Sequence, residues 1–241
     1  MRAAVSAPDE LNVMSAGAAR GLVETVKAPF ERDAGVRVHA TFGAVGTIRE
    51  LLATGAPCDV VILSAAVLDP LARDGRVDAA TQAPLGWVHT GIAVKQDAHR
   101  PAIGDLPALR DALLAASALF VPDPERATAG IHCVAMLKRL GIAGDMASRL
   151  RAYPHGAAAM QALARAPDDS AIGCTQVTEI KYTPGVELVA LLPAPFELST
   201  LYSVAVTSTA RHAAHARAFA ALLTGAQTQA LREQGGFEAQ R

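Results

Sequence analysis

The first half of the chain alternates between short apolar runs and segments whose apolar residues recur at every third or fourth position. The first periodic segment places Leu22, Val26 and Phe30 on one face, which predicts an amphipathic helix. The short apolar runs predict strands, and they are LNVMSAG (11–17), VRVHATF (36–42) and CDVVILS (58–64). Helices are expected between and after them, at 18–35, 46–55 and 65–75.

Strand–helix alternation of this kind is typical of a parallel sheet with helices on both faces. CDVVILS is nearly all apolar, which favours a central position between parallel strands. Ligands of such folds bind outside the carboxyl ends of the strands. The turns SAGA, FGAVG and LSAA each follow a predicted strand, so we expect them at that edge of the sheet.

A second α/β unit follows a long apolar strand that we expect over 85–97. Its predicted strands are 118–124, 150–155 and 170–176, and its predicted helices are 106–116, 128–142 and 156–167. A strand at 199–208 then leads into one or two terminal helices that pack back on the first unit. The expected α/β fold has two lobes, 1–86 plus 200–241 and 87–199, with a ligand cleft between them.

Charge and composition narrow the range of partners. The 241 residues hold 22 Lys and Arg against 23 Asp and Glu, a net charge of −1, and this balance predicts no nucleic-acid partner. Apolar residues make up 51% of the chain, enough for a packed core. A membrane span needs about 18 consecutive apolar residues, and we expect none here.

The three cysteines, Cys58, Cys133 and Cys174, are far apart and odd in number. Their spacing indicates neither a metal site nor a disulfide framework. We therefore expect them in the interior as small apolar side chains.

The first 19 residues bear on location. They lack the run of about 7–15 apolar residues that a secretory signal needs, which favours a cytoplasmic protein. A mature form trimmed from a longer precursor would instead be periplasmic, and a transporter partner is expected only in that case.

Four turns place a helix start after a strand: SAGAARG (15–21), FGAVGTI (42–48), ATAGIH (127–132) and YPHGAAA (153–159). Free backbone N–H groups at a helix start favour an anion. Two such turns from each lobe predict an anion cleft. The candidate ligand-binding residues are Ser15, Gly17, Arg20, Val45, Gly46, Thr47, Ser64, Thr128, Ala129, Gly130, Gly156, Thr175 and Gln176.

Histidines are the candidate proton carriers, because imidazole titrates near neutral pH. His155 and His132 lie beside two of the four helix starts and are candidate general bases, or hydrogen-bonded or surface residues. The remaining histidines, His39, His89, His99, His212 and His215, are expected to be structural or exposed. Arg20 is either a solvated side chain or a fork for a ligand carboxylate.

Sequence motifs resemble a known family over about residues 11–235. They are TFGAVG (41–46), GAPCDVVI (55–62), TAGIHCVAMLKRLGI (128–142), and GAAAMQALARAPDDSAIGCTQVTEI (156–180) followed by VELVALLPAPF (186–196). The chain resembles the molybdate-binding-protein-like branch of the type 2 periplasmic solute-binding proteins. The resemblance implies two α/β lobes that close over an oxyanion.

The ligand set departs from that of the molybdate binders. Ala18 stands where they present a serine, and Val45 and Gly46 surround the place of a second one. The tyrosine of their late strand aligns near Thr175 or Gln176. Because a site made of hydrogen bonds discriminates strongly when donors change, molybdate is not the expected ligand.

The SAGA turn and the YPHGAA segment resemble a subgroup that includes aconitate isomerases, which move a proton between carbons of a tricarboxylate without a cofactor. Two functions follow. The chain binds a small oxyanion or polycarboxylate, or it is a cytoplasmic, cofactor-independent isomerase of a tricarboxylate in which His155 or His132 is the base. A sensor domain is a third alternative, but no segment is left over for a signalling module.

Overall fold

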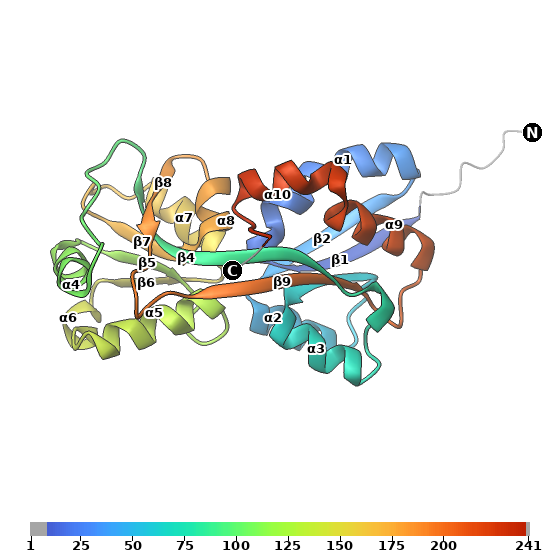
Figure 1. The fold of residues 1–241 in the computed structure, drawn as a ribbon, viewed down its shortest axis with the longest axis horizontal. Coiled ribbons are helices and arrows are strands. Elements are labelled where there is room, and N and C mark those ends of the chain that lie inside the picture. Colours follow the sequence, from blue (N-terminus) through green and yellow to red (C-terminus); the bar gives the residue numbers. More distant parts are fainter. Residues whose placement is uncertain (1–8, 240–241) are drawn as a thin grey trace, which may run out of the picture.

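The computed structural model describes residues 9–239 and has two α/β lobes arranged along its long axis (Figure 1). Two long strands, β4 (Ala83–Lys95) and β9 (Ser199–Val206), run through the middle of the molecule, and β4 pairs with strands of both lobes. The fold is therefore the expected two-lobed α/β fold. The expectation about cellular location rests partly on residues 1–8, which lie outside the described residues.

The first lobe is built on β1, which pairs in parallel with β2 and β3. Helix α9 packs against β9, and its Phe219 ring meets Phe30 edge to face with centroids 4.9 Å apart. Helix α9 therefore packs on the first lobe. The elements of this lobe are β1 (Glu10–Ala16), α1 (Arg20–Ala34), β2 (Arg37–Gly43), α2 (Val45–Ala53), β3 (Val60–Ser64), α3 (Ala65–Arg73), α9 (Ala213–Thr224) and α10 (Gln229–Gly235).

The second lobe continues the sheet from β4 through β7 and β5 to β6, with β8 on the other side of β4. Strands β5, β6 and β7 are parallel to one another, and β4 is antiparallel to β7 and β8. Its elements are α4 (Leu106–Ala115), β5 (Leu119–Pro122), α5 (Thr128–Arg139), α6 (Ala143–Met146), β6 (Leu150–Tyr153), α7 (Gly156–Ala164), β7 (Ile172–Gln176), α8 (Val177–Tyr182) and β8 (Val186–Leu191).

The structure corrects two details of the sequence prediction. Strand β3 is parallel to β1 but antiparallel to β9, so the sheet is mixed rather than wholly parallel. The direction of β9 is set by the crossing from the second lobe, which no local pattern encodes. Helix α8 and strand β8 were also missed, because each has only 6 residues and shows no clear period.

The apolar core is divided between the lobes. One cluster of buried side chains draws on 11–88 and 202–237, and two further clusters lie within 92–196. The exact lobe boundaries stay a prediction. All three cysteines are buried in these regions.

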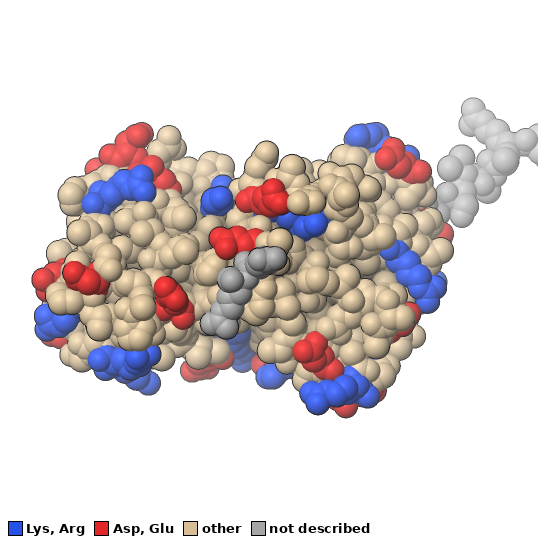
Figure 2. All heavy atoms as spheres, in the orientation of Figure 1, with Lys and Arg blue, Asp and Glu red and all other residues tan. Residues whose placement is uncertain are grey.

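Surface charge is mixed in sign. Figure 2 shows basic and acidic side chains interspersed over the visible face, as the net charge of −1 leads one to expect. Within residues 9–239, no helix combines the length and the apolar character needed to cross a membrane.

Candidate functional site

Four helix starts, two from each lobe, converge on one small cavity between the lobes. Each start follows directly or closely on a strand, so the carboxyl ends of β1, β2, β5 and β6 point toward the same place. The cavity is lined by Ala16, Gly17, Ala18, Gly43, Ala44, Val45, Pro122, Ala127, Thr128, Ala129, His155, Gly156, Gln176, Glu179 and Tyr202. Its free volume is about 20 Å³, room for one water-sized group.

Residues at helix starts make up much of this cavity wall. Among the described residues, α2 and α5 begin without a side-chain cap, and of their first N–H groups that of Gly46 donates to the carbonyl of Arg126. The short 3₁₀ turn Gly17–Ala19 that precedes α1 also begins without a side-chain cap. Such convergent N–H groups and helix dipoles favour negative charge.

An internal carboxyl group, that of Glu179, occupies the centre of this arrangement. Glu179 belongs to α8 and is only 5% exposed. A Cβ atom added at Gly17 or at Gly156 would overlap its carboxyl oxygens. Both lobes therefore leave space for this side chain by having glycine at a helix start.

Hydrogen bonds hold the Glu179 carboxyl in place. Thr175 Oγ1 donates to Glu179 Oε2 at 2.6 Å. Burial raises the pKa of Glu179 above its ordinary value, while Thr175 and the backbone amides of Ala157, Gly156 and Gln176 act in the opposite direction. The result is a buried acid that gives up its proton at a higher pH than a surface glutamate.

A buried phenol faces the same carboxyl group. Tyr202 of β9 lines the cavity and is hydrogen-bonded to Thr128 at the start of α5. Burial and the charge of Glu179 raise the pKa of Tyr202, so its hydroxyl group keeps its proton at neutral pH. The cavity thus combines an acid, a phenol and an imidazole.

That imidazole, His155, caps α7. Its Nδ1 accepts a hydrogen bond from Ala158 N at 3.2 Å, which places the proton of the neutral ring on Nε2. Burial, and then the charge of Arg20, lowers the pKa of His155. The neutral form of the ring is therefore favoured, with its Nδ1 lone pair taken by Ala158 N and its Nε2–H as a hydrogen-bond donor.

Arg20 contributes positive charge near the site. Its guanidinium carbon lies 5.4 Å from the ring centroid of Phe42. Its Nε is buried and has no hydrogen-bond partner within residues 9–239. Arg20 does not line the cavity, so its positive charge acts on the site from a distance.

A larger cleft of about 660 Å³ adjoins the small cavity, and Val45 and Thr128 line both. Arg49 and Arg126 lie along it. The two lobes touch at this cleft, where Gly46 N donates to the carbonyl of Arg126 at 3.0 Å. Arg126 also forms a salt bridge of 3.4 Å with Glu50 on α2.

The structure brings many of the sequence-predicted residues to these two spaces. The small cavity is lined by Gly17, Val45, Thr128, Ala129, His155, Gly156 and Gln176, and the larger cleft by Val45, Gly46, Ser64 and Thr128. The N–H group of Gly46, expected to face a ligand, instead donates across the cleft to Arg126.

Other candidate residues lie elsewhere. His132 belongs to α5 and lines neither space. Its Nε2 is 2.8 Å from the carbonyl oxygen of Phe196. Ser15 Oγ donates to the carbonyl of its neighbour Ala16. Gly130 packs so closely on the backbone of β5 and its following turn that a Cβ atom would collide there.

Three further candidates lie beside the two spaces without lining them. Thr175 donates a hydrogen bond to the Glu179 carboxylate, and the charge of Arg20 lowers the pKa of His155. Thr47 is in the first turn of α2. Its Cβ lies 3.6 Å from the place that a Cβ atom would take if one were added at Gly43. These residues can position or polarise the site.

Glu179 and Tyr202 are not among the site residues predicted from the sequence. Glu179 was hidden because α8 has no amphipathic period, and a glutamate gives no local sign of being buried. The one available signal is its position three residues after Gln176, at the end of a predicted strand.

Two α/β lobes with a cavity between their helix starts have the fold of periplasmic binding proteins. The chain belongs to the family of bacterial extracellular solute-binding proteins, which it matches over residues 11–238.

Two relatives of similar sequence carry names of different functions, an isomerase and a binding protein. An aconitate isomerase from a Pseudomonas species is 28% identical over 237 residues, covering 95% of this chain and 87% of the relative. The molybdate-binding protein ModA of Escherichia coli is 25% identical over 230 residues, covering 95% and 88%.

Solved structures share the fold. The periplasmic molybdate-binding protein of Azotobacter vinelandii has a TM-score of 0.76 at 17% identity, covering 96% of this chain and all (100%) of that one. The sulfate-binding protein SubI of Mycobacterium tuberculosis has a TM-score of 0.69 at 20% identity, covering 95% and 86%.

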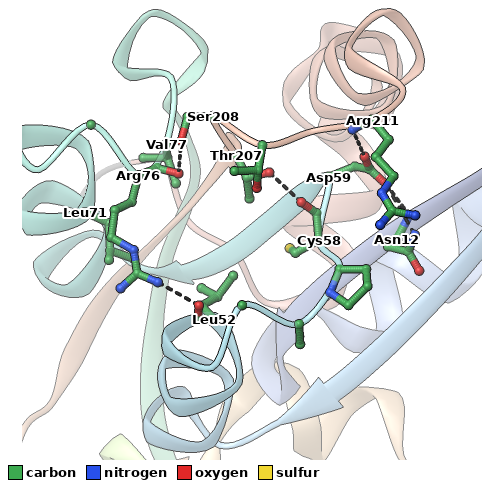
Figure 3. A pocket seen from close by; sticks show the side chains of 15 residues that line it. Asn12, Leu52, Cys58, Asp59, Leu71, Arg76, Val77, Thr207, Ser208 and Arg211 are labelled. Atoms are coloured by element: carbon green, nitrogen blue, oxygen red, sulfur yellow. Dashed lines mark hydrogen bonds between the residues drawn. The ribbon is translucent and has the colours of Figure 1, made fainter.

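A separate pocket of about 330 Å³ lies on the first lobe at the amino ends of β1 and β3, the edge of the sheet opposite the cavity (Figure 3). Asp59 closes one side of it. Asn12 N and Arg211 N donate to its carboxylate at 2.8 Å and 2.6 Å. This pocket shares no lining residue with the interlobe cavity.

Proposed function

We propose that the protein binds a small polycarboxylate between its lobes and moves a proton between two of its carbons, with Glu179 as the group that carries the proton. The observation that carries this proposal is the buried carboxyl of Glu179 at the point where four helix starts meet.

Glu179 is a buried acid with a raised pKa, which suits it to exchange a proton with a substrate carbon. The small cavity has a free volume of only about 20 Å³, so most of a polycarboxylate would lie in the adjoining cleft of about 660 Å³.

Isomerisation of an aconitate needs few groups. A base removes a proton from the methylene carbon, the double bond shifts, and a proton returns to the former vinyl carbon. The atoms of substrate and product are the same, so no cofactor is consumed. The N–H groups of the helix starts would stabilise the negative charge that develops on the substrate carboxylate beside the reacting carbon.

The remaining carboxylates of such a substrate need cationic partners. Arg49 and Arg126 line the adjoining cleft and can supply this charge. The resemblance to an aconitate isomerase over 95% of this chain supports the same substrate class.

The test is proton NMR of cis- and trans-aconitate in D₂O with the full chain. We expect isomer interconversion with deuterium uptake. Glu179→Gln should lower turnover about 10²–10⁴-fold, the usual contribution of a general acid–base group, while the exposed Glu233→Gln should leave it unchanged. Full turnover in Glu179→Gln would contradict the role given to Glu179.

A second candidate is binding of an oxyanion without chemistry, favoured by the uncapped starts of α2 and α5. In that case molybdate or sulfate raises the melting temperature, and neither aconitate isomer is converted. Delivery to a transporter would further require that the protein be exported.

A further inference from the structure

Three side chains that are typical metal ligands meet on the first lobe. Asp9 precedes β1, His212 immediately precedes α9, and His215 lies in the first turn of α9. Their ligand atoms all lie within 4.8 Å of one another, and Asp9 Oδ2 is 3.5 Å from His212 Nδ1. None of the three lines the interlobe cavity or the cleft beside it.

The backbone around these residues is fixed independently of any ion. The carboxylate of Asp59 accepts hydrogen bonds from Arg211 N at 2.6 Å and from His212 N at 3.3 Å, which anchors the turn that enters α9. Figure 3 shows Asp59 between Asn12 and Arg211. The Asp9 carbonyl accepts from Arg37 N at 2.8 Å, which ties Asp9 to the start of β2.

The two imidazoles lie close together at the entry to α9. His212 immediately precedes the helix and His215 is in its first turn, with ring centroids 6.4 Å apart. Both rings are partly buried, whereas Asp9 is exposed. A cation held there would keep an open side for water.

We propose that Asp9, His212 and His215 bind a divalent transition-metal cation, with Zn²⁺ as the reference ion. Two imidazole nitrogens and one carboxylate oxygen are a donor set that suits Zn²⁺, Co²⁺ or Ni²⁺ better than Ca²⁺ or Mg²⁺. Tetrahedral zinc ligands at bond lengths near 2.1 Å lie about 3.4 Å apart. The Asp9–His212 separation of 3.5 Å already matches this spacing.

A simple Asp9–His212 ion pair is the competing interpretation of the same distance. It requires no contribution from His215, whereas a metal site loses a third of its protein ligands without that residue. The start of α9 carries a partial positive charge that opposes a cation, and the Asp9 carboxylate offsets it.

The consequence concerns the stability of the first lobe. A bound ion would link the residue before β1 to α9, which are 203 positions apart (212 − 9). Because the three ligands come together only in the folded chain, the ion binds the folded state and raises its melting temperature.

The experiment uses the full chain without an affinity tag, stripped with a chelator and titrated with Zn²⁺ by calorimetry. We expect one ion per chain. Co²⁺ should give visible absorption bands that Zn²⁺ abolishes by displacement. His215→Ala should weaken the affinity at least tenfold, while His99→Ala, which changes an exposed histidine of the other lobe, should not.

Melting temperatures in chelator show whether each variant folds. If His215→Ala is unfolded, Asp9→Asn replaces it and should weaken Zn²⁺ binding to a similar degree. Unchanged affinity in a folded His215→Ala or Asp9→Asn variant, or no binding by the parent chain at 100 µM Zn²⁺, would overturn the proposal.

Discussion

Thr175 Oγ1 donates a hydrogen bond of 2.6 Å to Glu179 Oε2, across the junction between β7 and α8. Both side chains are buried, at 0% and 5% exposure. This bond sets the direction of the only acidic side chain that lines the small cavity among the described residues. The chemistry proposed for the cavity therefore depends on a threonine that does not itself line it.

Replacing Thr175 with valine removes this donor while keeping the shape of the side chain. We expect the pKa of Glu179 to rise further, because a bond to its charged form is lost. The acidic limb of the pH–rate profile should move to higher pH. The free energy of unfolding should fall by about 1–3 kcal/mol. Thr54→Val, which changes an exposed threonine, is the control for both measurements.

The raised pKa of Glu179 also predicts how stability varies with pH. Above the ordinary value of 4.5 the unfolded chain loses this proton, while the folded chain keeps it up to the raised pKa. The folded state binds more protons in that window, so this group's contribution falls as pH rises. The gain in stability of Glu179→Gln over the parent should therefore grow with pH through the window.

Urea unfolding of both proteins between pH 4 and pH 8 measures this difference, with Glu233→Gln as the control. A difference that is constant over the whole range would show that Glu179 titrates at its ordinary pKa in the folded chain.

Gly156→Ala places a methyl group against the Glu179 carboxyl and the Thr175 hydroxyl. Because a Cβ atom has no space there, we expect a loss of about 1–3 kcal/mol in stability and a loss of ligand binding. Gly144→Ala is a matched control, since nothing lies within 4 Å of the added Cβ. Thermal unfolding with and without aconitate compares the two, and equal melting temperatures would contradict the packing argument.

Gly46→Pro should weaken the contact between the lobes. It removes the N–H that donates to the Arg126 carbonyl, and the proline ring would crowd Arg126, whose backbone atoms lie 3.1–3.2 Å from the place of an added Cβ. We expect a larger radius of gyration by small-angle X-ray scattering. Arg126→Ala keeps that carbonyl and removes only the exposed salt bridges to Glu50 and Asp123, so its radius of gyration should stay close to that of the parent.

Sequence patterns predicted most elements of this fold. The apolar runs and helical periods before residue 176 correspond to strands and helices with ends shifted by a few residues, and Gly35 and Gly75 follow helices with positive φ as helix-ending glycines do. The prediction of convergent helix starts followed from the rule that parallel strands present their carboxyl ends at one edge. These features depend on residues close together in the chain, so a local pattern is enough.

By itself, the sequence determined the two α/β lobes, the order of their elements and the four glycine- or alanine-rich helix starts. Only the tertiary structure decided that the space between those starts holds the carboxyl of Glu179, and that Asp9 meets His212 and His215. The physical reason is the same in both cases. Burial of a charge and the meeting of distant ligands depend on donors and partners supplied by segments far apart in the chain, and no period in the sequence records them.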